Sequence, residues 1–381
     1  MFFRDTWIEI DLDAIEYNLT QLKNHYVKDK SIIAVIKADA YGHGAVEVAK
    51  SVIRSGAQCL AVATLDEAIQ LRLNDIHHPI LVLGNVPLKG LPMASKFNIA
   101  VTVHSLEWLK KAVAVHVNHL DVQIKIDTGM HRIGILNKID LIKVLSIIDD
   151  NPHFKLIGIY SHLATADEAN PDYYFKQINK FKSLLEGIET DDLLIHLSNS
   201  IATIKYTDTI TNAVRIGLML YGVNPMPEIM LKFSLKPALA LYTRIVQCKK
   251  LSNGARVSYN GIYEVMDEEW IGTIPIGYAD GFDRRIKNGV VYVDNTYAPV
   301  VGHVCMDQTM IRLPRKISEN TIVEMIGPHI SVDDIARWSG TISYQVLTQL
   351  SKRLPRIYKR NNEIISIINE GLNIYRDDKH D

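Results

Sequence analysis

Short apolar runs alternate with amphipathic, helix-like segments from residue 10 to about residue 220. The apolar runs have the length and composition of β-strands, and they cover 31–36, 59–64, 80–84, 99–103, 122–127, 155–162, 193–198 and 213–217. This alternation is typical of a parallel sheet with helical crossovers. Eight β/α units predict a closed (β/α)8 TIM barrel, an α/β fold that carries its reactive groups at the carboxyl ends of the strands.

The pattern changes after residue 233, where strand-like runs follow one another with turn residues between them. We therefore predict a barrel domain over 10–233 and a mostly antiparallel β domain over 234–381, with an N-terminal strand in 1–9 packed on it. Two short helices are expected in "SVDDIARWSG" and "SYQVLTQLSKRL". Before the barrel, Asp13 and Glu16 have the spacing of a helix N-cap and its third-position partner.

Composition excludes several classes of function. The 381 residues, 47% of them hydrophobic, are enough for two domains with large cores. The 42 basic and 43 acidic residues leave a formal charge of −1, so nucleic acid is not an expected partner. Cys59, Cys248 and Cys305 form no CxxC pair, which predicts no metal cluster and a cytoplasmic location. The sequence has neither a signal-peptide pattern nor an apolar run of about 18 residues, so no membrane association is expected.

Lys37 ends the first strand-like run, directly before the glycine-containing turn "YGHG". A lysine at this end of a barrel strand lies at the barrel mouth, where partial desolvation disfavours the ammonium and frees a nucleophilic amine. Such an amine can form a Schiff base. The alternative is an ordinary solvated loop lysine.

The fifth strand-like run ends in "KIDTGMHRIG", which holds Lys125, Asp127 and Arg132. Strand alternation places Lys125 and Asp127 on one face of the strand and Ile124 and Ile126 on the other. The two isoleucines suit the face that packs against the helices, so Lys125 is expected inside the barrel. A buried cation is costly unless it is paired or chemically neutralised. A salt bridge with Asp127 is the structural alternative.

The last three strand-like runs also end in polar residues. His162 follows the sixth, Asn199 and Ser200 follow the seventh just before a helix-like stretch, and Arg215 and Gly217 close the eighth. TIM barrels often bind phosphate at the loops after strands seven and eight, where backbone N–H groups can meet an anion. Together these residues predict a phosphorylated cofactor, although His162 alone could be a core histidine.

In the β domain, Tyr259, Tyr278, Met306 and Asp307 each lie beside a turn. A tyrosine that is half-buried in a sheet is ordinary, so a structural role for Tyr259 stays open on this ground alone.

Ten motifs occur in the order and at about the spacing of one known family, and they span nearly the whole chain. They are "WIEIDLDAI", "AVIKADAYGHG", "KIDTGMHRIG", "SHLATADE", "NS", "RIGLMLYG", "VSYNG", "PIGYADG", "GHVCMDQ" and "LPRIY". On these motifs the chain resembles the bacterial alanine racemases, isomerases that use pyridoxal 5′-phosphate (PLP). The resemblance implies interconversion of L- and D-alanine by two bases, which supplies D-alanine for peptidoglycan.

The resemblance also implies roles for individual residues. Lys37 would hold the cofactor and act as acid and base on one face of the substrate, and Tyr259 of a second subunit would act on the other face. A homodimer with shared active sites follows from this. The positions that match cofactor-binding residues are Lys37, Tyr41, Arg132, His162, Asn199, Ser200, Arg215, Gly217, Leu218 and Tyr344. Those that match substrate-binding or access residues are Arg132, Tyr278, Met306 and Asp307. Lys125 matches a position where many members carry a carbamylated lysine.

Two positions depart from the family pattern. Asn260 stands where a glycine usually follows the catalytic tyrosine, and Asn tolerates the left-handed region that such a turn needs. Gln345 stands where a glutamate commonly follows the tyrosine that matches Tyr344. Two other classes remain to be separated from a racemase: a PLP-binding regulator, which would resemble the barrel alone, and a cofactor-free Schiff-base aldolase.

Overall fold

The chain forms two compact units in the computed structural model, which describes residues 2–206, 210–370 and 372. The barrel unit comprises the described residues of Ile15–Ala40 and Ala45–Lys236. The β unit comprises the other described residues, including the short segment Tyr41–Gly44.

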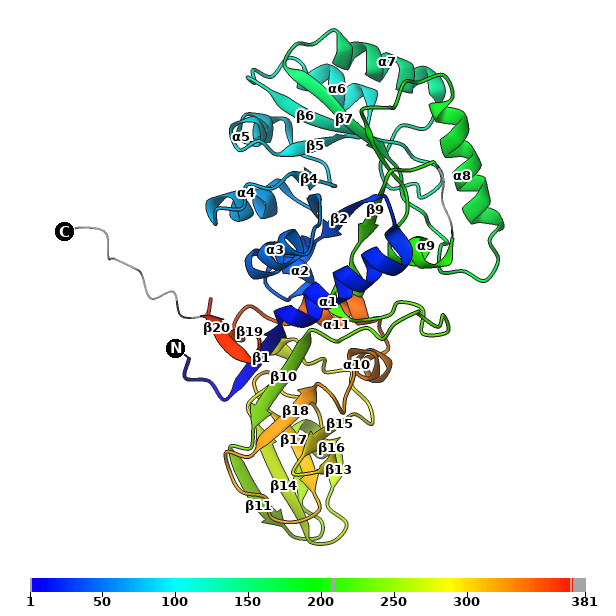
Figure 1. Ribbon diagram of the computed structural model, residues 1–381. Helices are drawn as coiled ribbons and strands as arrows, with labels where there is room; N and C mark the ends of the chain where they lie inside the picture. Colours follow the sequence, from blue (N-terminus) through cyan, green and yellow to red (C-terminus); the bar gives the residue numbers. More distant parts are fainter. Residues whose placement is uncertain (1, 207–209, 371, 373–381) are drawn as a thin grey trace, which may run out of the picture. The chain divides into compact units, whose positions relative to one another are not determined.

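Eight parallel strands close the barrel, in the order β2 to β9, and this confirms the predicted TIM-like fold (Figure 1). They are β2 (Ser31–Val35), β3 (Cys59–Val62), β4 (Ile80–Val82), β5 (Ala100–Val103), β6 (Leu120–Lys125), β7 (Phe154–Tyr160), β8 (Leu194–His196) and β9 (Ala213–Ile216). Every residue of β3 and β5 is buried, because one face looks into the barrel and the other packs under helices.

Helices connect and cover the barrel strands (Figure 1). They are α3 (Ala45–Arg54), α4 (Leu65–Leu73), α5 (Leu91–Lys96), α6 (Leu106–Ala112), α7 (Lys138–Asp149), α8 (Asp172–Leu185) and α9 (Ser200–Lys205). Thr64, Ser105 and Asn137 cap α4, α6 and α7 by accepting from backbone N–H groups of the first turn. These caps satisfy donors that a helix start leaves free, so each helix begins at a defined residue.

The first helix, α1 (Leu12–Leu22), begins differently from the expectation. The Oδ1 atom of Asp11 accepts from the N–H of Ala14 at 3.0 Å, whereas Asp13 lies inside the first turn. The predicted cap at Asp13 was therefore wrong by two residues. Two aspartates flank this helix start in sequence, and the spacing rule selected the wrong one.

The β unit contains a ten-stranded sheet that is antiparallel except for one pair, as expected for a mostly antiparallel domain. Its strands, in spatial order, are β11 (Gln247–Leu251), β14 (Glu269–Ile274), β17 (Thr309–Leu313), β16 (Thr296–Val301), β15 (Val290–Val293), β18 (Ile322–Ile326), β10 (Leu239–Arg244), β1 (Thr6–Asp11), β19 (Arg356–Arg360) and β20 (Glu363–Ile368). Strand β1 pairs antiparallel with β10 and parallel with β19.

Smaller elements complete the β unit. Strands β12 (Arg256–Val257) and β13 (Tyr263–Glu264) form a two-stranded ribbon, and a 3-10 turn, η4 (Tyr259–Gly261), lies between them. Another, η5 (Tyr278–Asp280), follows β14. The two expected helices are present as α10 (Val332–Ser339) and α11 (Ser343–Gln349). Within the described residues, no helix has the length and apolar character that crossing a bilayer requires.

Candidate active site

Lys37 opens a turn of unusual backbone conformation at the carboxyl end of β2. Ala38, Asp39 and Ala40 have φ of 52°, 53° and 53° with ψ of 51°, 47° and 49°, which is a left-handed helical turn without glycine. Each L-residue in this conformation costs roughly 1–2 kcal/mol. Backbone strain of this kind persists only where the surrounding structure imposes it.

Two carboxylates impose the turn within the barrel unit. Glu67 accepts through Oε1 from the N–H of Ala38 at 2.7 Å, and through Oε2 from the N–H of Ala63 at 2.7 Å. Asp39 accepts from the N–H of Ala45 at 2.8 Å. Glu67 therefore ties the residue that follows Lys37 to the end of the neighbouring strand, β3.

The surroundings of Lys37 favour its neutral amine. Burial lowers the pKa of Lys37, and Arg132 and Arg215 lower it further, while the carboxylate of Glu67 opposes the shift. Arg132 is exposed and has no hydrogen-bond or ion-pair partner within the part of the chain described here. A lysine amine that loses its proton readily is a nucleophile and a base.

Arg215 on β9 is buried and anchored by two histidines and three backbone carbonyls, one of them that of His196, to which Nη1 donates at 3.3 Å. Its Nη1 lies 2.6 Å from Nδ1 of His196, and its Nη2 lies 3.1 Å from Nδ1 of His162. Nη2 also donates to the carbonyls of Ser161 at 2.8 Å and Leu197 at 2.9 Å. Among the described residues, none accepts from Nε. The guanidinium thus has one N–H left for a ligand.

The two histidines are held neutral. Burial lowers the pKa of both His162 and His196 well below the usual range, and the charge of Arg215 adds to the effect. His196 also stacks on Tyr160, with ring centroids 4.7 Å apart, and contacts Oε1 of Gln123 through Nε2 at 2.7 Å. The expected support of Arg215 by His162 is present in the geometry, and His196 adds a second support.

Lys125 is the last residue of β6, and its side chain is buried as expected. Its Nζ lies 4.7 Å from the centroid of the Tyr160 ring, and burial, Arg215 and Arg132 lower its pKa well below the usual range. The alternative salt bridge to Asp127 does not form. Asp127 instead accepts from the N–H groups of Gly129 at 2.9 Å and His131 at 3.1 Å.

The residues after β8 and β9 meet at one place. The Oγ of Ser200 accepts from the N–H of Gly217 at 3.0 Å, and Leu218 follows in a buried 3-10 turn. Asn199 caps α9, because its Oδ1 accepts from the N–H of Ala202 at 2.9 Å. The side chain of Asn199 therefore stabilises the start of helix α9, whose first residue is Ser200.

Tyr41 and Tyr344 belong to the β unit, where their rings lie 5.9 Å apart. Burial raises the pKa of Tyr41 above its usual range, so this phenol stays a hydrogen-bond donor. The next residue, Gly42, is fixed by the buried Arg356, whose Nε donates to its carbonyl at 2.9 Å. This contact fixes the backbone beside Tyr41.

Tyr259 lies on the turn between β12 and β13 and is 61% exposed, so it is not the half-buried sheet tyrosine of the structural alternative. The flanking residues Ser258 and Asn260 have φ of 68° and 61°. Ser258 donates from Oγ to the carbonyl of His303 at 2.7 Å. Asn260 thus occupies the left-handed region that this residue type tolerates.

The other access residues of the β unit also lie at the surface. Tyr278 is on η5, and Met306 and Asp307 lie between β16 and β17. Tyr278 donates its N–H to the carbonyl of Cys305 at 3.0 Å. This bond brings the turn that carries Tyr278 beside the segment that carries Met306 and Asp307.

Three residues of the barrel site were not predicted: Glu67, Tyr160 and His196. Tyr160 and His196 are the last residues of β7 and β8. A search for polar groups at the carboxyl ends of otherwise apolar strands would have found them. Glu67 has the appearance of an ordinary capping-box residue after Thr64, and its bond to Ala38 has no local signal.

A closed (β/α)8 barrel with a partly buried, easily deprotonated lysine and two arginines at its strand ends, followed by an antiparallel β unit, defines a class of barrel enzymes that use a lysine amine. Comparison with known families identifies the member of this class. Residues 10–225 match the family described as "Alanine racemase, N-terminal domain", and residues 238–358 match "Alanine racemase, C-terminal domain". The chain belongs to the alanine racemase family.

Individual relatives agree over almost the full length. The chain is 45% identical to the alanine racemase of Anoxybacillus flavithermus, with 97% of this chain and 99% of the relative covered. It is 39% identical to alanine racemase 1 of Bacillus subtilis, with 98% of each covered.

Solved structures of amino-acid racemases are similar to this chain over almost its full length. The alanine racemase of Bacillus anthracis with bound L-Ala-P superposes with a TM-score of 0.93 at 42% identity, covering 97% of this chain and 98% of that one. A histidine racemase of Leuconostoc mesenteroides is also similar, with a TM-score of 0.88 at 30% identity, covering 94% and 99%.

Proposed function

We propose that this chain interconverts L-alanine and D-alanine with pyridoxal 5′-phosphate as cofactor, and so supplies D-alanine for peptidoglycan. The observation that carries the proposal is the lysine at the end of β2, whose pKa is lowered by burial and by two arginines. Alanine is favoured over histidine as substrate, because similarity to the alanine racemases is greater than to the histidine racemase.

The residues of the barrel unit fit this cofactor by their chemistry. Arg132 and Arg215 place positive charge at the strand ends, beside the amines of Lys37 and Lys125, and such a cluster suits an anionic ligand with a phosphate and a phenolate. The free Nε–H of Arg215 suits a ring nitrogen that accepts a hydrogen bond. When bound, PLP supplies an aldehyde for the lysine amine and a ring that withdraws electrons from the substrate α-carbon.

Lys37 and Tyr259 carry the proton transfers in this proposal. Racemisation removes the α-proton from one face and returns a proton to the other, so two acid/base groups must flank the α-carbon. Nζ of Lys37 serves one face, and Oη of Tyr259 from a second copy of the chain serves the other. The exposure of Tyr259, Tyr278 and Met306 in one unit supports a homodimer that covers them.

Arg215 stays protonated while it holds the ring nitrogen. Burial lowers the pKa of Arg215 to about 10, which is still well above neutral pH. The guanidinium therefore donates a hydrogen bond without giving up its proton. By keeping its own proton, Arg215 would leave the ring nitrogen unprotonated and the ring a weaker electron acceptor, which would favour return of the proton to the α-carbon over transamination.

Other residues are assigned to binding. Ser200 with the backbone of Gly217 and Leu218 is assigned to the phosphate, and Arg132 to the substrate carboxylate. Tyr41 and Tyr344 match positions that bind the phosphate in the family. Met306 and Asp307 of the second copy close the site, and Tyr278 lines the access to it.

Lys125 is proposed to be carbamylated. Its lowered pKa leaves the neutral amine that reacts with carbon dioxide, and the product is an anion that suits the surrounding arginines. Protein prepared with ¹³C-bicarbonate should show a carbamate resonance by NMR, and Lys125→Ala should lack it. An identical resonance in both proteins would contradict the assignment.

One experiment tests the proposed function. The purified protein, supplied with PLP and L-alanine, should form D-alanine, which D-amino-acid oxidase detects. Lys37→Ala should form none. A visible absorption band that borohydride abolishes would separate a PLP enzyme from a cofactor-free aldolase. The same band without D-alanine, and with no turnover of L-histidine, would instead indicate a binding protein.

A further inference from the structure

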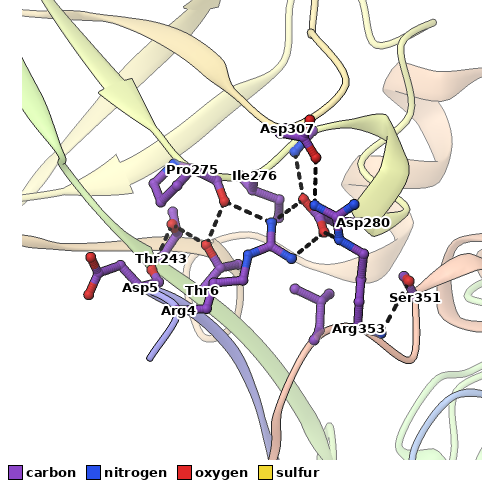
Figure 2. A network of polar contacts seen from close by, with 12 residues as sticks. Arg4, Asp5, Thr6, Thr243, Pro275, Ile276, Asp280, Asp307, Ser351 and Arg353 are labelled. Atoms are coloured by element: carbon purple, nitrogen blue, oxygen red, sulfur yellow. Dashed lines mark hydrogen bonds and ion pairs between the residues drawn. The ribbon is translucent and has the colours of Figure 1, made fainter. Parts of the chain in front are cut away.

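Asp280 at the end of η5 is a fully buried carboxylate that pairs with two arginines from distant parts of the β unit (Figure 2). Nη1 and Nη2 of Arg4 contact its two oxygens at 2.5 Å each. Nε of Arg353 lies 2.9 Å from Oδ1, and the N–H of Gly277 donates to Oδ2 at 3.0 Å. A buried carboxylate with this many donors has its charge satisfied and its position fixed.

Arg353 continues the network to Asp307 (Figure 2). Its Nη2 donates to Oδ1 of Asp307 at 2.6 Å, while its Nε remains on Asp280. The Asp307 side chain is 55% exposed, so burial does not hold it in place. The bridge from the buried Asp280 both orients Asp307 and offsets its negative charge.

The backbone reinforces the same connection. Ala279, next to Asp280, donates its N–H to the carbonyl of Met306 at 3.0 Å. A Cβ atom at Gly277 would lie 2.2 Å from the carbonyl oxygen of Cys305, so the two segments approach more closely than any other residue type allows. The turn with Tyr278 and the segment with Met306 and Asp307 are therefore one rigid piece.

We propose that Arg4, Asp280 and Arg353 are positioning residues, which set the orientation and the charge of the Tyr278, Met306 and Asp307 surface that the substrate meets. The proposal rests on the proposed function, in which this surface closes the active site of a second copy. Alanine reaches that site with a carboxylate, and an Asp307 without Arg353 would repel it. Arg353 thus acts on substrate binding through Asp307.

Steady-state racemisation by the holoenzyme tests this inference. Arg353→Met should raise KM for alanine about two- to fivefold, as loss of a partly exposed ion pair predicts, with kcat within about twofold of wild type. Arg337→Met is the matched control: Arg337 pairs with Asp334 at 2.5 Å on the exposed face of helix α10 and contacts neither Asp280 nor Asp307. It should leave KM unchanged.

A double-mutant cycle identifies the route of the effect. Because Asp307→Asn removes the charge that Arg353 offsets, Arg353→Met should change KM by less than about twofold in that background. Arg353→Lys keeps the charge but reaches only one carboxylate, so it should give a KM between those of wild type and Arg353→Met. This variant replaces Arg353→Met in the test if the Met variant does not accumulate.

Two results would overturn the inference. One is an unchanged KM in both Arg353 variants. The other is an equal effect of Arg353→Met with and without the Asp307 carboxylate, since Arg353 would then act by another route. If the wild-type holoenzyme itself formed no D-alanine, the proposed function would fail instead, and this outcome is distinct from the other two.

Discussion

Nη1 of Arg215 donates a hydrogen bond to Nδ1 of His196 across 2.6 Å, inside the barrel. A ring nitrogen that accepts from a guanidinium carries no proton, so the proton of His196 lies on Nε2 and points to Oε1 of Gln123 at 2.7 Å. His162 accepts from the same guanidinium in the same way. Arg215 and its two neutral histidines therefore form one buried network with a fixed protonation state.

This network predicts how stability depends on pH. The pKa values of His162 and His196 lie well below 6.5 in the folded chain, whereas the unfolded chain binds protons at both sites below about pH 6.5. Their contribution is therefore complete above that pH and is lost as the pH falls. For each unit by which the pH falls, each histidine should lower the free energy of unfolding by up to about 1.4 kcal/mol. Urea unfolding between pH 7.5 and pH 5 measures the slope.

His196→Gln is the control for this slope. Glutamine can accept from Arg215 but does not titrate, so the variant should lose less stability between pH 6.5 and pH 5 than the wild type. Equal slopes would show that His196 does not contribute to the pH dependence.

Glu67 is predicted to tune Lys37. Removing its negative charge by Glu67→Gln should lower the pKa of Lys37 further, because an anion beside an ammonium favours the charged form. The acidic limb of kcat, which reports the Lys37 amine in the substrate complex, should then move to lower pH. Glu67 also accepts from the N–H groups of Ala38, Ala63 and Thr64, so the variant should lose about 1–3 kcal/mol of stability.

The matched variant for this prediction is Glu47→Gln. Glu47 pairs with Lys50 on the surface of α3 and is not among the groups that shift Lys37. Its pH profile and stability should equal those of the wild type. An acidic limb that moves in both variants, or in neither, would exclude a specific effect of Glu67 on Lys37.

Sequence patterns predicted the barrel, the β unit and the position of Lys37, because strand alternation and strand-end polarity are local signals. Glu67 escaped prediction because its bond to Ala38 joins two strand ends that only the folded barrel brings together. The left-handed turn after Lys37 escaped for a different reason: Ala38, Asp39 and Ala40 include no glycine that would indicate positive φ. Tertiary hydrogen bonds, rather than local preference, determine that conformation.

The left-handed turn predicts opposite effects for one substitution at two places. Ala38→Gly should raise stability or leave it unchanged, because glycine adopts φ of 52° without the steric cost that alanine has. Ala49→Gly, inside helix α3, should lower stability by about 1 kcal/mol or more, because glycine has the lower helix propensity and a buried methyl group is lost. Urea unfolding of both variants measures the sign of the change in the free energy of unfolding. A loss at Ala38 as large as that at Ala49 would show that the turn is not left-handed in solution.

A shared active site predicts complementation between two inactive chains. Lys37→Ala and Tyr259→Phe should each abolish racemisation in homodimers, because every site then lacks one of its two bases. A heterodimer of the two, isolated through different affinity tags on the two chains, contains one site with both bases intact. It should show about half of the wild-type activity per dimer.

The reciprocal heterodimer makes this test decisive. When a Lys37→Ala/Tyr259→Phe chain pairs with a wild-type chain, a shared arrangement leaves one site without its lysine and the other without its tyrosine. This dimer should therefore be nearly inactive. If each chain used its own Lys37 and Tyr259, the activities would reverse: the complemented heterodimer would be inactive, and the wild-type chain of the second would retain about half of the activity. The turn that exposes Tyr259 would then have to serve its own barrel, and the assignment of this tyrosine to a second copy would be wrong.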